Sequence, residues 1–142
     1  MMRRQKGFSL IELLLVVAII GIIAAIAIPN LQNANRISRE AAAISNLRQL
    51  VSAEGAYLAS VGGYASYGLL SDLITHNLVD SSFTAIRSSY LFTITQPNGA
   101  GSYQIRAAPQ AGGLKFFYAR ENGQILENTA DDIAAATPIS NR

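Results

Sequence analysis

The chain begins with an apolar run and continues as an amphipathic pattern. The run extends from Phe8 to Ile28, and its only polar side chains are Ser9 and Glu12. A membrane-spanning helix needs about 20 apolar residues at a rise of about 1.5 Å each. The run is therefore long enough to cross a bilayer once. Because it is apolar on every face, it suits burial in lipid or among identical helices.

After Pro29, apolar residues recur mostly at steps of three and four, as expected for one face of a helix. The sequence Gly62-Gly63 is a stop signal for that helix. We therefore predict one helix from about Phe8 to Ser60, bent near Pro29, with Arg36, Arg39, Glu40, Arg48 and Glu54 mainly off the apolar face. The predicted apolar face consists of Leu31, Ala34, Ile37, Ala41, Ile44, Leu47, Val51 and Leu58.

The remainder of the chain has the pattern of short strands joined by tight turns. Residues 62–88 form a connecting segment that could hold a short helix at about 68–76, and the tail after Asn128 predicts no element. Asn122-Gly123 is a strong two-residue hairpin signal. Three or four such strands favour an antiparallel meander packed on the long helix, an α+β fold. The predicted strands are 89–95, 102–108 and 114–119, the last with Leu114, Phe116 and Tyr118 on one face, and then 124–127.

Charge and cysteine content narrow the possible functions. The chain has 11 Lys and Arg against 9 Asp and Glu, but Arg3, Arg4 and Lys6 lie in the first six residues. Without residues 1–7 the counts are 8 and 9, a net charge of −1, so no overall basic excess favours nucleic acid. The absence of cysteine excludes disulfides, iron–sulfur clusters and thiol catalysis.

The basic N-terminus and Glu12 together indicate whether the apolar run is a retained membrane helix or a secretory signal peptide. Cations before the run favour a cytoplasmic N-terminus and a C-terminal domain outside. A secretory signal peptide is an alternative, but the run exceeds its usual apolar core of roughly 7–15 residues. Glu12 also carries a charge into the run, which costs about 2.5–3.5 kcal/mol at mid-helix and less near the end. Such a residue is a functional hypothesis by default.

The segment Lys6-Gly7-Phe8-Ser9-Leu10-Ile11-Glu12-Leu13 resembles the cleavage and methylation motif of type IV pilins and type II secretion pseudopilins. The resemblance covers about residues 3–30. It implies that a prepilin peptidase and N-methyltransferase cuts after Gly7 and methylates Phe8, and that the fold is pilin-like. Gly21 and Pro29 fall where the family has residues that loosen the helix.

Glu12 has two readings in this setting. Cleavage would create an ammonium at Phe8, and the Glu12 of a neighbouring subunit could pair with it, which would offset desolvation and select an axial stagger. Alternatively, Glu12 only reaches toward the headgroups. We favour the pairing role.

Other chemistry is weakly supported. His76 is the only histidine, no Gly-rich phosphate loop or nucleophile elbow occurs, and we expect no catalytic, cofactor or metal site. Asp131-Asp132 could contribute to a calcium site but lacks the rest of a ligand set. Aromatic residues, among them Tyr57, Tyr64 and Tyr67, are expected to pack in the core and at interfaces.

The sequence thus predicts a non-enzymatic subunit that polymerises with itself into a pilus-type filament. We expect a leader at 1–7, a transmembrane and filament-core helix at 8–29, an amphipathic helix at 30–61 and a head at 62–142. The expected location is the bacterial cytoplasmic membrane before assembly and an extracellular or periplasmic filament afterwards, with a platform protein and its ATPase supplying work. The alternatives are a pseudopilin of a short periplasmic filament and, from another class, a membrane enzyme or binding domain on an uncleaved anchor.

Overall fold

A computed structural model describes residues 7–112 and 114–139. The chain divides into two compact units, Met1–Asn35 and Arg36–Arg142, and the first helix, α1, passes from one into the other. The helices are α1 (Leu10–Ser60), α2 (Leu70–Thr75) and a short 3-10 helix η1 (Ser81–Thr84). The strands are β1 (Tyr90–Thr95), β2 (Gln104–Pro109), β3 (Phe116–Arg120), β4 (Ile125–Asn128) and β5 (Thr137–Pro138).

The single long helix predicted from the sequence is confirmed, with its start moved from Phe8 to Leu10. Its N-terminal backbone is satisfied by Ser9, whose carbonyl accepts the Glu12 and Leu13 N–H groups at 3.1 and 3.3 Å. Its C-terminus closes where the Gly62 N–H bonds back to the Tyr57 carbonyl. Gly63 there has a φ of 58°, a left-handed conformation that glycine adopts without a steric penalty. The predicted stop is therefore also confirmed.

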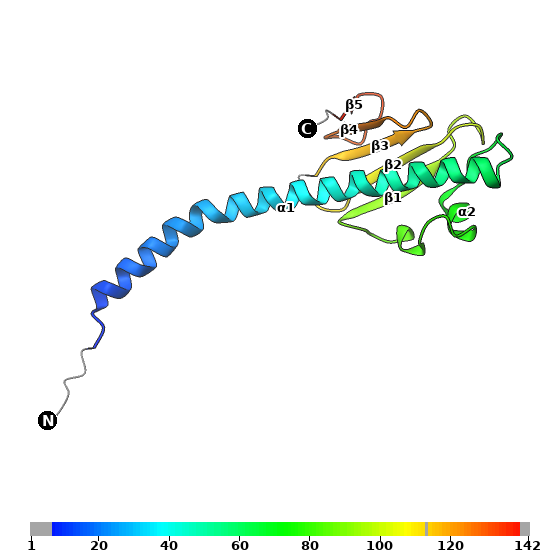
Figure 1. Cartoon of the computed structure of the whole chain (residues 1–142). Helices are drawn as coiled ribbons and strands as arrows, with labels where there is room; N and C mark the ends of the chain where they lie inside the picture. Colours follow the sequence, from blue (N-terminus) through cyan, green and yellow to red (C-terminus); the bar gives the residue numbers. More distant parts are fainter. Residues whose placement is uncertain (1–6, 113, 140–142) are drawn as a thin grey trace. The chain divides into compact units, whose positions relative to one another are not determined.

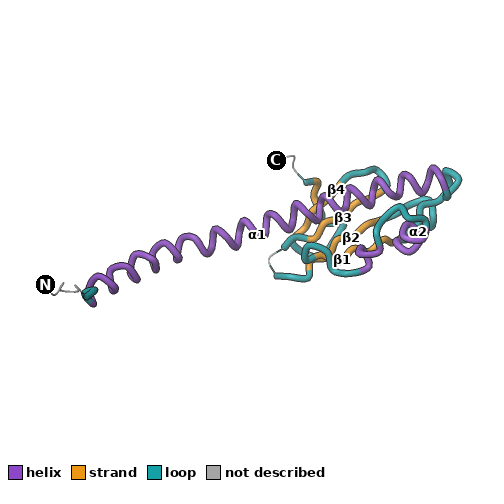
Figure 2. Tube along the Cα trace, turned by 60° about the horizontal axis from the view of Figure 1, so that its bottom comes forward, coloured by secondary structure: helices purple, strands orange, loops and turns teal. Residues whose placement is uncertain are grey.

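The strands form one antiparallel sheet in the order β1-β2-β3-β4-β5, so each strand pairs with its neighbour in sequence. Within the second unit, the C-terminal part of α1 lies across one face of this sheet (Figure 1). The predicted meander and the short helix after Gly68 are confirmed. The structure adds η1, which lies against β1 (Figure 2), and the two-residue β5. Neither was predicted, because four and two residues are too few to show a period.

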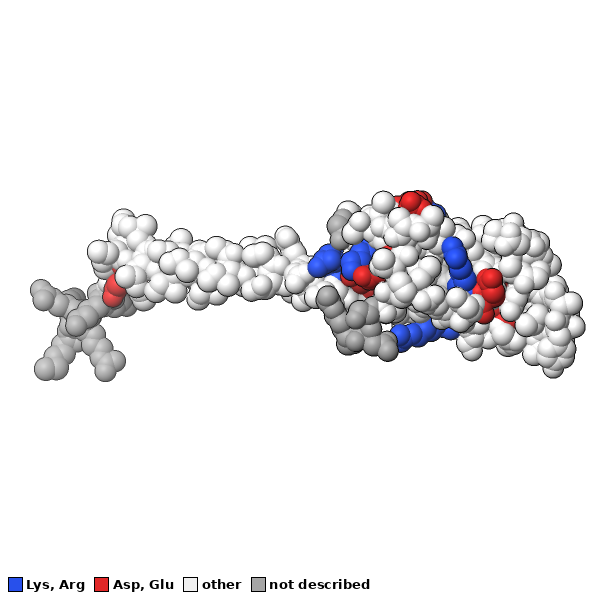
Figure 3. All heavy atoms as spheres, turned by 90° about the horizontal axis from the view of Figure 1, so that it is seen from above, with Lys and Arg blue, Asp and Glu red and all other residues white. Residues whose placement is uncertain are grey.

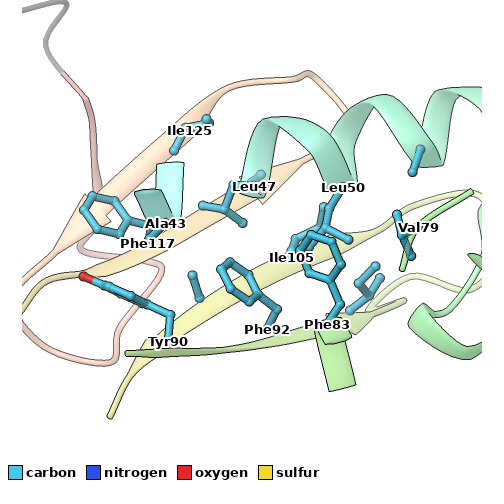
Figure 4. Close-up of a cluster of buried hydrophobic side chains, with 14 of the residues drawn as sticks. Ala43, Leu47, Leu50, Val79, Phe83, Tyr90, Phe92, Ile105, Phe117 and Ile125 are labelled. Carbon is cyan, nitrogen blue, oxygen red and sulfur yellow. The ribbon is translucent and has the colours of Figure 1, made fainter. Parts of the chain in front are cut away.

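The core of the second unit lies between α1 and the sheet. Ala43, Leu47 and Leu50 of α1 are fully buried, and Phe92 and Ile105 meet them from the strands (Figure 4). Close packing of this kind supplies most of the favourable free energy of a small domain. The head therefore contains a core of its own, part of it supplied by α1.

The buried face of α1 differs from the predicted one by about one residue. Leu47 was placed correctly, and Ile44 and Val51 pack partly buried against the core. Ala41 is exposed, however, and Glu54 is fully buried, although it was predicted to lie off the apolar face. The steps from Ala43 through Leu47, Leu50 and Glu54 are four, three and four, so the pattern was present, but a charged residue was not expected in it.

The predicted face of the third strand was also wrong. Phe117 and Ala119 point into the core, because they pair with Ala107 and Ile105 of β2, whose side chains share that face. Phe116, a partly exposed residue, and Tyr118 therefore belong to the opposite face. The prediction used Leu114 as the first residue of the alternation. Leu114 is buried in the core, but it precedes the strand, which begins at Phe116, and so does not fix which face the strand residues take. The predicted turn before this strand includes Gly113, which lies outside the described residues.

Candidate assembly site on the N-terminal helix

The first part of α1 exposes an almost wholly apolar surface. Between Phe8 and Leu31 the described chain exposes fifteen large apolar side chains by 46 to 81% of their surface. Figure 3 shows this segment as white, with acidic atoms at its N-terminal end. By length and composition, α1 is the one helix among the described residues that is apolar enough to cross a membrane. An apolar surface of this extent indicates a lipid or protein partner.

Glu12 is the only charged residue between Gly7 and Asn35. Its Oε2 accepts a hydrogen bond from the Ser9 N–H at 2.8 Å. Ser9 is the residue before the helix, so Glu12 completes half of a capping box three positions into α1. A carboxylate in the first helical turn is also favoured by the helix dipole. The structure thus gives Glu12 a defined position at the helix tip.

Gly7 and Phe8, the predicted cleavage and methylation residues, precede the helix. Both lack regular secondary structure, and the Phe8 side chain is 81% exposed. The peptide bond between them therefore lies outside the hydrogen-bonded part of α1. The rest of the predicted leader, residues 1–6, lies outside the described residues. Cleavage and methylation at these positions remain predictions.

Gly21 and Pro29, the predicted loosening residues, both lie inside α1. The segment between them is helical in this structure, so no break occurs there in the isolated chain. A β-carbon on Gly21 would meet no atom within 4 Å. Pro29 lacks the N–H of an ordinary helical residue and crowds the preceding turn. Loosening of the helix at these two residues remains a prediction.

The carboxylates of Asp131 and Asp132 accept hydrogen bonds from other groups of the chain. The Asp131 carboxylate accepts bonds from the Arg106 Nε at 2.7 Å, from a second guanidinium nitrogen and from the Tyr118 hydroxyl at 2.9 Å. The Arg106 hydrogen bond holds the pKa of Asp131 below its ordinary value. Asp132 Oδ1 accepts from the Ala134 N–H at 2.8 Å. Within residues 7–112 and 114–139, no cluster of three or more acidic or histidine side chains could hold a metal.

The remaining candidate side chains pack against one another. The His76 ring meets Tyr57 edge-on at 5.7 Å between centroids, and Tyr67 meets Tyr103 at 4.7 Å. Tyr64 is 79% exposed. These contacts support packing for Tyr57 and Tyr67, as expected, and they place His76 at the end of α2.

Comparison with known proteins agrees with this geometry. Residues 2–28 match a family model described as the prokaryotic N-terminal methylation motif. The chain is 31% identical over 129 residues to the type IV wide pilus major component PilA4 of Thermus thermophilus, covering 91% of this chain and 92% of that protein. It is 28% identical to the type II secretion system core protein G of Klebsiella michiganensis, covering 93% and 94% of the two chains.

A further match is more local. The chain is 44% identical over 64 residues to the type IV major pilin protein PilA of Myxococcus xanthus, which covers 45% of this chain and spans only 29% of that protein's length. No solved structure matches the chain significantly. Nearly full-length similarity to PilA4, the methylation motif and the apolar helix joined to a small sheet agree with one another. The chain belongs to the family of type IV pilins and type II secretion pseudopilins.

Proposed function

We propose that this chain is a structural subunit of a type IV pilus-type filament, processed after Gly7 and polymerised through α1. The observation that carries the proposal is the exposed apolar helix with one acid, Glu12, at its tip. A helix that exposes so much apolar surface requires lipid before assembly and neighbouring helices afterwards. A membrane anchor alone would need the apolar surface but not the acid.

Pairing between subunits gives Glu12 its role. Cleavage after Gly7 turns the Phe8 nitrogen into an ammonium, and both this group and Glu12 lose hydration inside lipid or a filament core. The Ser9 bond uses Glu12 Oε2, so Oε1 can receive the ammonium of a subunit displaced along the filament axis. Registers that leave either charge unpaired are penalised. The pair therefore selects the stagger between subunits.

The order of events follows from the chain's layout. The basic leader keeps the N-terminus on the cytoplasmic side, where a prepilin peptidase and N-methyltransferase cuts and methylates. The subunit then waits as a single-pass protein with its head outside. A platform protein and its ATPase supply the work of assembly. The chain itself contributes its packing surface and charge pair, and we assign it no catalysis.

The segment from Gly21 to Pro29 adapts the helix to the filament. Proline inside a helix removes one backbone hydrogen bond, and it is less favourable there than alanine by about 3 kcal/mol. Stretching this segment during packing therefore costs less than stretching any other part of the apolar run. Small residues nearby, Ala18, Ala24 and Ala25 with Gly21, allow close helix approach.

The second candidate is a pseudopilin of a short periplasmic filament, favoured by the core protein G relative. Immunogold electron microscopy of sheared surface fibres separates the two at native expression. A pilus subunit labels along long extracellular fibres, which disappear when its gene is deleted. Fibres that form only on overexpression would favour the pseudopilin. A chain found only as an unassembled membrane protein beside a complete apparatus would contradict both.

A further inference from the structure

Glu54 is an acidic side chain buried in the head. It lies on the core face of α1 and is 0% exposed. Its Oε2 accepts the Gly68 N–H at 3.0 Å. Its Oε1 is buried without a hydrogen-bond partner, and within residues 7–112 and 114–139 only Arg87 Nη1 shares that condition. An unpartnered buried oxygen of a charged group is costly, so this position demands an explanation.

Glu54 provides one of several contacts that hold the loop of residues 61–69 against the head. Tyr67 donates its N–H to the Ala100 carbonyl at 2.7 Å, and its own carbonyl accepts from Gln96 Nε2 at 2.8 Å. Gly68 fits closely, because a β-carbon there would lie 3.2 Å from the Tyr57 ring and 3.3 Å from Asp72 Cβ. The loop therefore covers Glu54 and separates it from water.

The electrostatic surroundings of Glu54 oppose a charge. The pKa of Glu54 is raised to about 7: burial is the largest influence and raises it, the Gly68 hydrogen bond lowers it, and the Asp72 carboxylate adds a smaller rise. The Glu54 carboxylate also interacts electrostatically with the Tyr103 hydroxyl and contributes to raising the pKa of that tyrosine. Asp72 of α2 and Tyr103, which precedes β2, interact electrostatically with Glu54. One step further away, Tyr67 packs on Tyr103, Glu121 acts on Tyr103, and His76, the residue after α2, packs on Tyr57.

We propose that Glu54 is a proton-controlled latch: its neutral form keeps residues 61–69 seated, and its ionised form favours an open loop in which water reaches the carboxylate. The sign follows from the burial. A carboxyl group whose pKa rises on folding contributes most below its ordinary pKa, and that contribution is lost as the pH rises through its folded value. The latch therefore holds most firmly in acid, loosens progressively between about pH 4.5 and about pH 7, and changes little at higher pH.

The latch controls the surface at one end of the head. The loop carries Val61, Tyr64 and Leu69, which are 41, 79 and 42% exposed. Opening moves these apolar side chains relative to the sheet. A partner that contacts this end would therefore meet two surfaces, selected by pH. This inference does not depend on whether the filament is a pilus or a pseudopilus.

Amide hydrogen exchange measures the latch directly. The full processed chain in detergent micelles is exchanged at pH 5.5 and 8, and rates are corrected for intrinsic chemistry to give protection factors for residues 61–69. Glu54 has an ordinary pKa of 4.5 in the open loop and about 7 in the seated loop. The equilibrium constant for opening therefore rises on the order of thirtyfold from pH 5.5 to pH 8. Strand β2, in the core, should stay far better protected than residues 61–69 at both pH values, which shows that the loop opens without unfolding of the head.

Two variants identify the responsible group. Glu54→Gln keeps the size and removes the titration, so its loop protection should be independent of pH. Glu121→Gln removes an exposed acid in the turn after β3 and should behave like the wild type. Constant protection in the wild type, or a pH dependence that survives in Glu54→Gln, would overturn the proposal. If Glu54→Gln does not fold, the carbon-13 shift of the wild-type Glu54 carboxyl decides, since a midpoint near 4.5 contradicts the latch.

Discussion

The two parts of α1 have similar apolar residues but place them in opposite environments. Leu31, in the first unit, is 63% exposed, whereas Leu47, in the second, is fully buried beneath the sheet. The second part satisfies its apolar face within the chain. The first part does not, so its free energy depends on lipid or on other copies. One continuous helix thus joins a segment that needs partners to a head that folds around its own core.

The largest expected effect comes from the acid in the first part. Glu12→Gln should leave membrane insertion intact but reduce filament yield more than tenfold, because the Phe8 ammonium loses its counter-charge and staggered registers are no longer selected. Fibre sheared from cells with a complete assembly apparatus is quantified against the membrane pool of subunit. Glu40→Gln, on the same helix, is the matched control and should assemble normally. Normal yield from Glu12→Gln would refute the pairing role.

A leucine in each part of the helix tests the comparison itself. Leu47→Ala should lower the free energy of unfolding of the head by about 2–5 kcal/mol, since it removes core contacts and leaves a cavity. Leu31→Ala should change that quantity by less than about 0.5 kcal/mol. Both are measured by denaturant unfolding in micelles with a probe in the sheet. Equal effects of the two substitutions would mean that the two parts of α1 are not energetically distinct.

A smaller effect is expected at the sheet face away from α1. Asp131→Asn removes the charge that binds Arg106, and because both side chains are partly exposed the cost at pH 7 should be about 1 kcal/mol or less. The pKa of Asp131 is lowered by folding, so the contribution of its charge is present above its ordinary pKa. It is lost as the pH falls through the folded value.

The difference between wild type and Asp131→Asn should therefore shrink on acidification below about pH 4. Thermal unfolding at several pH values measures it. A difference that stays constant down to pH 2 would show that charge is not what holds Asp131 to Arg106.

The smallest effect belongs to a partly buried ion pair on α1. Arg36 and Glu40 form an ion pair at 3.3 Å with i,i+4 spacing. Glu40→Gln should cost only about 0.2–0.5 kcal/mol in the unfolding of the head. The same denaturant assay in micelles measures it, at low salt. A cost above 1 kcal/mol would indicate that this pair contributes more to the head than an ordinary i,i+4 ion pair does.

Much of this architecture follows from sequence periodicity. The long helix and the meander carry repeated local signals, and their prediction is confirmed. A turn occurs at Asn122-Gly123 as predicted, but four residues, 121–124, separate β3 from β4, where two were expected. The strand β5 and the seating of Glu54 could not be predicted, because each depends on residues far apart in sequence. Glu54 in particular is tolerated in the core by a backbone N–H fourteen positions away. The sequence analysis placed Glu54 off the apolar face, because a charged side chain was not expected in the core, and that prediction was wrong.

The assembly site was the opposite case. Gly7, Phe8 and Glu12 carry a strong local motif, so the sequence alone specified their roles as hypotheses. The structure adds that Ser9 and Glu12 cap the helix, which no periodicity reveals. Their roles in cleavage, methylation and pairing involve other molecules and are proposals that experiments on the assembled protein must test.

The intact mass of the mature subunit tests the central claim most directly. Processing after Gly7 predicts a chain that begins at Phe8 and is heavier than residues 8–142 by one methyl group, with the methyl on the Phe8 nitrogen in fragment spectra. A mature chain that retains residues 1–7 would contradict the account. It would favour a membrane anchor, since no ammonium would then exist at Phe8 for Glu12 to pair with.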